Sequence, residues 1–147
     1  MDKIVLHGRK VVGGVVEGEA LVTKETISGW GGIDVKTGTI IDVRHELAGQ
    51  CFAGKVLVYH GAKGSSGWSS QFHQARNNGV APLAMVFKET TTKIALGCVV
   101  THCPGVTDLD QDPTVVIHTG DWVRVDGDCG TVEVLRRKET PDCPNCP

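Results

Sequence analysis

The apolar positions of this 147-residue chain come in short runs separated by glycine-rich and polar turns. Runs of about four to eight residues rich in Val and Ile, with turn residues at both ends, are typical of β-strands. On this basis the pattern predicts strands at residues 3–6, 10–16, 19–23, 39–43, 55–59, 82–87, 115–117, 122–125 and 131–135. The chain is therefore expected to be rich in short strands.

One segment has the periodicity of a helix instead. Residues 69–78 place Phe72 and Ala75 at helical spacing, and Asn77-Asn78-Gly79 provides a C-terminal stop. The order of strand, glycine-rich loop, helix and strand over residues 55–87 predicts a βαβ unit. We therefore expect an α/β fold whose sheet is parallel in part.

Composition favours a folded domain that binds neither nucleic acid nor membranes. The chain is 40% hydrophobic and only 5% aromatic, and its 19 glycines suit tight turns between strands. Its formal net charge is −2, and its scattered Lys and Arg residues lack the basic stripe of nucleic-acid-binding proteins. No apolar run approaches the roughly 20 residues of a membrane-spanning helix. Residues 1–8 are too poor in apolar side chains for a signal peptide, so we expect a cytoplasmic location.

The six cysteines are expected to be reduced thiols, because no secretory signal is seen. Cys98 and Cys129 lie in Val-rich segments and are predicted to be buried as small apolar side chains. Cys143 and Cys146 form a single CxxC pair, which is a weak zinc signal and favours an incidental tail. The segment 98–103 holds two cysteines and a histidine that could ligate iron, but not a complete ligand set.

The loop at residues 61–67, Gly-Ala-Lys-Gly-Ser-Ser-Gly, is the strongest candidate for chemistry. Open α/β sheets bind ligands at the carboxyl ends of their strands, and the following helix N-terminus suits a carboxylate or phosphate. Lys63 adds a positive charge. A phosphate-binding P-loop is disfavoured, because Gly64 separates the lysine from Ser65. Composition equally allows a simple turn in which Ser65 or Ser66 caps the helix.

Several short motifs, in their order and spacing, resemble the swivel domain of the aconitase X family. They are Lys63-Gly64-Ser65-Ser66 after a hydrophobic strand, the segments 29–34, 37–42 and 79–86, and residues 119–126 followed by 130–134. The resemblance covers roughly residues 5–135. It implies a swivelling β/β/α domain with a β-rich, barrel-like core and few helices over residues 1–135. The polar, proline-rich residues 136–147 are expected to form a mobile tail.

The resemblance also implies a function as half of an active site. It describes the small subunit of a hydro-lyase whose large aconitase X subunit carries most of the substrate site and an iron–sulfur cluster or iron. Ser65, the first serine after Lys63-Gly64, matches the base that removes a proton from the substrate. Lys63, Gly64 and Ser66 are expected to bind a small anionic substrate. The expected substrate is cis-3-hydroxy-L-proline, with 5-phosphomevalonate as the alternative. A non-catalytic anion-binding module or a structural partner of a larger enzyme are the other possibilities.

The loop departs from classical aconitases at one position. Their arginine directly after the two serines binds a substrate carboxylate, and Gly67 stands there in this chain. Lys63 or the helix N-terminus is expected to take over that contact. Nearby, His60 is a candidate supporting residue, and Trp30 and Trp68 in glycine-rich loops are expected to contact the large subunit.

Overall fold

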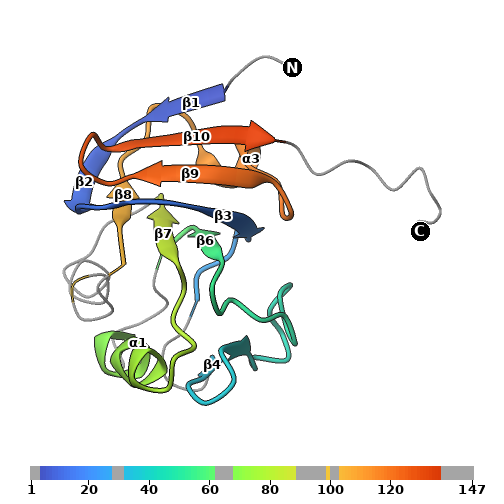
Figure 1. Cartoon of the computed structure of the whole chain (residues 1–147). Helices are drawn as coiled ribbons and strands as arrows, with labels where there is room; N and C mark the ends of the chain where they lie inside the picture. The colour runs from blue at the N-terminus through green and yellow to red at the C-terminus, as the bar shows by residue number, and fades with distance from the viewer. Residues whose placement is uncertain (1–3, 28–31, 62–67, 89–98, 100–102, 137–147) are drawn as a thin grey trace.

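The computed structural model describes residues 4–27, 32–61, 68–88, 99 and 103–136 (Figure 1). The described strands are β1 (Ile4–His7), β2 (Arg9–Val12), β3 (Val15–Val22), β4 (Ile33–Asp34), β5 (Thr39–Ile40), β6 (Val56–Tyr59), β7 (Ala84–Phe87), β8 (Gly105–Thr107), β9 (Trp122–Asp126) and β10 (Thr131–Arg136). The helices are α1 (Trp68–Asn77) and α3 (Pro113–Val116). This strand-rich architecture confirms the predicted fold class.

Eight strands form one sheet in the order β1-β10-β9-β3-β6-β7-β8-β2, and β4 pairs with β5 separately. The two ends of this order, β1 and β2, are joined in the chain by Gly8 alone, so the sheet curls almost into a closed barrel. A side chain at Gly8 would place its Cβ 2.4 Å from the backbone oxygen of Thr107, so only glycine fits at the closure. Gly8 thus links the two ends of the barrel-like sheet.

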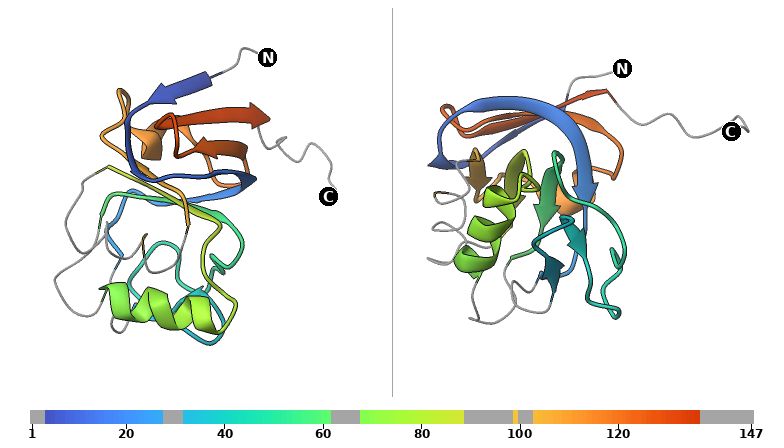
Figure 2. Two further views of the ribbon diagram at one scale, coloured as in Figure 1. Left: turned by 60° about the vertical axis from the view of Figure 1, so that its left-hand side comes forward. Right: turned by 60° about the horizontal axis from the view of Figure 1, so that its bottom comes forward.

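The long strand β3 joins an antiparallel half of the sheet to a parallel half. Its first five residues pair antiparallel with β9, and its last three, from Ala20 to Val22, pair parallel with β6. The right-hand view of Figure 2 shows how strongly this strand curves. Strands β6, β7 and β8 continue the parallel half, and Figure 1 shows α1 and β4 on the opposite side of β6 and β7 from β9 and β10.

Strands β6 and β7 are buried on both faces, which explains their uninterrupted apolar sequences. Val56 and Val58 contribute to the core inside the barrel, whereas Leu57 and Tyr59 contribute to the core that α1 covers. The helix closes this second core with Phe72, whose ring centroid lies 5.6 Å from that of Phe52.

The predicted βαβ unit is confirmed, because β6 and β7 are parallel and α1 lies between them in the chain. The helix also ends where the sequence predicts. Gly79 has φ of +77° and donates its N–H to Arg76, while the N–H of Val80 reaches back to Ala75. This is the hydrogen-bond pattern of a glycine-terminated helix.

Several predicted strands differ from the observed elements. The strand expected at 10–16 is divided between β2 and the start of β3, which are separated at Gly13-Gly14, where Gly14 has φ of +122°. The strand expected at 19–23 is present as the second half of β3. The strand expected at 115–117 is replaced by helix α3. Asp112 caps this helix by accepting the N–H of Thr114 at 2.9 Å, and Pro113 supplies a preset first helical turn. The strand expected at 39–43 is reduced to Thr39–Ile40.

One cysteine prediction is also wrong. Cys129 is exposed, because it lies in the turn between β9 and β10, where its N–H donates to the carboxylate of Asp126 at 3.0 Å. Cys103 is buried instead, and Cys51, Cys103 and Cys129 are reduced cysteines. Cys98 and the CxxC pair lie outside the described residues.

Candidate functional site

The two glycine-rich segments singled out in the sequence start side by side. Beyond the end of β3 the chain runs along the end of β6, where Thr23 donates its N–H to Val58 at 2.9 Å. Ile27 then donates its N–H to the carbonyl of Gly61 at 3.0 Å. Residues 28–31 continue from Ile27, and residues 62–67 continue from Gly61. Both segments therefore leave from the carboxyl edge of the parallel strands, where α/β sheets bind ligands.

The residues predicted to do the chemistry lie in the second of these segments. Ser65, Lys63, Gly64 and Ser66 are outside the described residues, as is Trp30, and the side chain of Trp68 is not described. The structure does describe the two residues on either side of the loop, Gly61 and the first residue of α1. His60 is half-buried, and its backbone N–H donates to the carbonyl of Glu25 at 3.3 Å.

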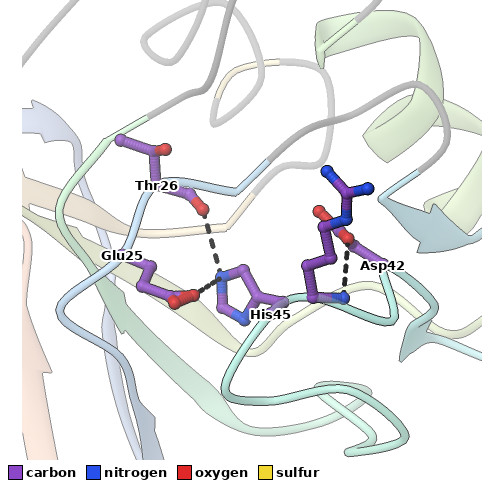
Figure 3. Close-up of a pocket in the computed structure, with 5 residues that line it drawn as sticks. Glu25, Thr26, Asp42 and His45 are labelled. Atoms are coloured by element: carbon purple, nitrogen blue, oxygen red, sulfur yellow. Dashed lines mark hydrogen bonds and ion pairs between the residues drawn. The ribbon is translucent and has the colours of Figure 1, made fainter.

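A buried histidine that the sequence analysis missed lies beside these strand ends (Figure 3). His45 is 8% exposed. Its Nδ1 accepts the N–H of Leu47 at 3.0 Å, so the ring proton sits on Nε2. That Nε2–H donates to the carbonyl of Thr26 at 3.1 Å, and a carboxylate oxygen of Glu25 lies 3.9 Å away. Both ring nitrogens therefore have defined partners in one tautomer.

Two glutamates tie the same two segments together. A carboxylate oxygen of Glu25 accepts the N–H of Glu46 at 3.2 Å. In return, a carboxylate oxygen of Glu46 accepts the N–H of Lys24 at 3.0 Å and the hydroxyl of Thr23. The hydrogen bond from Thr23 is the main reason that the pKa of Glu46 is lowered from its ordinary value of 4.5, with smaller help from the N–H of Lys24. Residues 23–26 and 45–47 thus form a hydrogen-bonded unit, called the clamp below.

The lowered pKa of Glu46 predicts a pH-dependent contribution to stability. Because folding favours its charged form, this contribution is present above pH 4.5 and is lost as the pH falls through the lowered pKa. We expect Glu46→Gln to lower the melting temperature near pH 7, and the difference from wild type to shrink towards about pH 3. Thermal unfolding of both proteins across this range measures it, and a difference independent of pH would contradict the assignment.

A polar pocket of about 340 Å³ opens at the clamp, lined by Glu25, Thr26, Asp42, Arg44 and His45 (Figure 3). A second pocket of about 320 Å³ is lined by residues 22–24, Glu46, and residues from α3 and the turn that follows it. The first pocket carries both acidic and basic groups next to the start of both glycine-rich segments. The only signal for it in the sequence is the mainly polar segment Asp42-Val43-Arg44-His45-Glu46, which overlaps the end of the strand predicted at 39–43.

The part of the chain that the structure describes contains no group of three His, Cys, Asp or Glu side chains that could hold a metal ion. Within the same residues, no helix is long and apolar enough to cross a membrane. The described side chains at the edge can therefore bind, orient and hydrogen-bond a ligand, but do not supply a metal-ligand set.

Known proteins match this chain over nearly its whole length. The family model of the aconitase X swivel domain matches residues 5–134. The phosphomevalonate dehydratase small subunit of Methanosarcina acetivorans is 38% identical over 138 residues, which cover 94% of this chain and 96% of that protein. The phosphomevalonate dehydratase small subunit of Thermococcus kodakarensis is 39% identical over 134 residues, covering 91% and 98%.

Two solved structures share the fold. The crystal structure of Thermococcus kodakaraensis aconitase X in its holo-form matches with a TM-score of 0.85 at 38% identity, covering 90% of this chain and 99% of that chain. A solution NMR structure of a UPF0107 protein matches with a TM-score of 0.83 at 41% identity, covering 90% and 100%. The similarity therefore extends from sequence to three-dimensional arrangement.

Proposed function

Because the chain belongs to the aconitase X swivel-domain family, as the small subunit of a dehydratase of that type, we propose that its complex with a large subunit dehydrates 5-phosphomevalonate. The observation that carries this proposal is the similarity to phosphomevalonate dehydratase small subunits over more than nine tenths of the chain. It favours the phosphorylated substrate over cis-3-hydroxy-L-proline, the substrate expected from the sequence. None of the relatives described above is named for cis-3-hydroxy-L-proline.

The reaction suits a serine base held in a glycine-rich loop. 5-Phosphomevalonate carries a carboxylate, a hydroxyl on C3 and a phosphate. Dehydration breaks the C2–H and C3–O bonds, forms the C2=C3 double bond and releases water. Ser65 Oγ takes the C2 proton in this proposal. A serine hydroxyl does so only where its alkoxide is stabilised, which Lys63 and loop N–H groups would provide.

The start of α1 supports binding of an anionic substrate. The helix is ten residues long, begins directly after the loop, and has no acidic side chain in its first turn. No acidic side chain of the first helical turn therefore opposes the positive end of the helix dipole, which favours a bound anion. We assign binding of the substrate phosphate or carboxylate to Lys63, Gly64, Ser66 and this helix end. These contacts would replace the one made by the arginine of classical aconitases, where this chain has Gly67.

The large subunit would approach at the same edge. Ile41 and Val43 follow β5 beside the polar pocket and are 47% and 88% exposed. Exposed aliphatic side chains next to a polar site suit a surface that a partner covers. The resemblance implies an iron–sulfur cluster or iron in the enzyme. We assign it to the large subunit, as the family resemblance implies.

The test is an assay of the complex purified after co-expression with the large subunit. We expect turnover of 5-phosphomevalonate, and a kcat/KM at least about 100-fold lower for cis-3-hydroxy-L-proline, because a site built for a phosphate leaves buried charges unpaired when the phosphate is missing. The opposite preference would identify a hydroxyproline dehydratase. Failure with both substrates, together with phosphate binding by the small subunit alone, would identify a non-catalytic anion-binding module.

A further inference from the structure

We propose that His45 is a positioning residue of this dehydratase. It fixes the backbone of Thr26 and Ile27, and through them Gly61, from which the loop that carries Ser65 continues. The inference rests on the proposed function, because it concerns the same loop. It starts from an observation independent of that function, namely that a buried polar ring connects two segments nineteen residues apart in the chain. Neither segment is held to the other by a β-ladder among the described residues.

His45 contacts Glu25 and Thr26, which immediately precede Ile27. The Nε2–H of the ring donates to the carbonyl of Thr26, one residue before Ile27. Ile27 in turn donates its N–H to Gly61, the last described residue before the loop. The Thr26 carbonyl and the Ile27 N–H belong to the same peptide group, so a shift of this group would be passed through one hydrogen bond to Gly61, from which residues 62–67 continue.

The ring of His45 is itself fixed. Leu47 donates its N–H to Nδ1, which leaves Nε2 as the donor and sets the orientation of the ring. Leu47 and Ile27 also belong to the same apolar core, so the backbone on both sides of the contact is anchored by buried side chains. The ring thus acts as a rigid spacer between two anchored segments.

The glutamates of the clamp connect the same two segments through the N–H groups of Lys24 and Glu46. Glu25 and Glu46 accept backbone N–H groups of the opposite segment in exposed hydrogen bonds. His45 is 8% exposed, its hydrogen bond from Leu47 is buried, and its hydrogen bond to Thr26 is partly buried. A buried hydrogen bond is protected from competition with water, so it holds geometry more strictly than an exposed one. This distinguishes His45 as the group that sets the position of the edge.

Two substitutions separate positioning from simple core filling. In His45→Gln the side-chain amide nitrogen can reach the place of Nε2 and keep the donation to Thr26. In His45→Asn the shorter side chain can accept the Leu47 N–H but cannot reach Thr26. We expect His45→Gln to keep kcat within about threefold of wild type and His45→Asn to lower kcat about 10- to 100-fold, with KM changed less than about threefold in both. The assay uses the assembled complex.

The structural readout is hydrogen exchange at the backbone N–H of Ile27, measured by NMR in the full small-subunit chain. We expect exchange to be at least about tenfold faster in His45→Asn than in wild type, and close to wild type in His45→Gln.

Val132→Ala is the stability control, since it removes buried methyl groups inside the barrel, in the other core. It should lower the melting temperature without lowering kcat. Should His45→Asn not fold, Glu46→Ala weakens the clamp from its exposed side and should raise Ile27 exchange with a smaller loss of kcat.

The outcomes distinguish this inference from the proposed function. Equal kcat values for His45→Asn and His45→Gln in an active complex would overturn the positioning role and leave the dehydratase assignment intact. The role would also be overturned if Val132→Ala lowered kcat as strongly as His45→Asn does, with both losses following the fall in melting temperature. If the wild-type complex dehydrated neither substrate, the proposed function would fail, and unchanged Ile27 exchange in His45→Asn would then refute the clamp separately.

Discussion

Replacing Ser65 by alanine is expected to lower the kcat of the assembled complex about 10²- to 10⁴-fold, which is the usual contribution of a general base. The substitution removes the oxygen proposed to take the proton from C2 and leaves the loop backbone in place. KM should stay close to wild type, because the substrate contacts proposed for Lys63, Gly64, Ser66 and the start of α1 remain. Steady-state kinetics on the purified complex measures both quantities.

Ser66→Ala is the matched control, since it removes the same atoms one residue further along the loop. If Ser66 binds the substrate but takes no proton, its substitution should raise KM and keep kcat within about threefold of wild type. Size-exclusion chromatography of both variants with the large subunit checks that assembly is unaffected. Turnover by Ser65→Ala near that of wild type would refute Ser65 as the base, and a large loss in Ser66→Ala alone would move the role to that serine.

Phe72→Ala is expected to destabilise the chain by about 3–5 kcal/mol, the range observed for large-to-small substitutions of buried aromatics. Phe72 is fully buried and is packed against Phe52 beneath α1. Its removal leaves a cavity between the helix and the second core, which the surrounding strands cannot fill. Denaturant unfolding of the small subunit measures the change in free energy.

Phe72→Leu serves as the control, because it keeps most of the buried apolar volume and should cost only about 1–2 kcal/mol. The comparison separates the loss of volume from the loss of the aromatic ring. A cost below 1 kcal/mol for Phe72→Ala would show that α1 does not pack on this core. Since α1 begins where the Ser65 loop ends, that result would also remove the structural support for binding an anion at the helix N-terminus.

The βαβ unit was predictable because its signals are local. Residues 56–59 and 84–87 are apolar without interruption, as strands buried on both faces must be, and Phe72 and Ala75 lie on one side of a short helix. Gly79 adopts the left-handed conformation that ends the helix. The motifs around this unit were also sufficient to indicate the family, which the family model confirms over residues 5–134.

Local errors arose where two local preferences competed. Residues 115–117 are β-branched and favour a strand, but the side chain of Asp112 and the ring of Pro113 begin a helix just before them. The β-propensity of Val and Ile depends on a strand partner, and no described strand pairs with residues 115–117. At Gly13-Gly14 the apolar pattern continues although the backbone leaves the strand conformation there. Periodicity alone therefore predicted one strand where the structure has the end of β2 and the start of β3.

By itself, the sequence determined the strand-rich class, the parallel βαβ unit with its glycine-rich loop, and the family to which these belong. Each of these depends on residues close together in the chain. Only the tertiary structure decided how the barrel closes at Gly8, which strand ends share an edge, and that His45 reaches Thr26 beside Gly61. The physical reason is that a hydrogen bond between distant segments depends on strand order and register, which no local pattern of apolar and polar residues specifies.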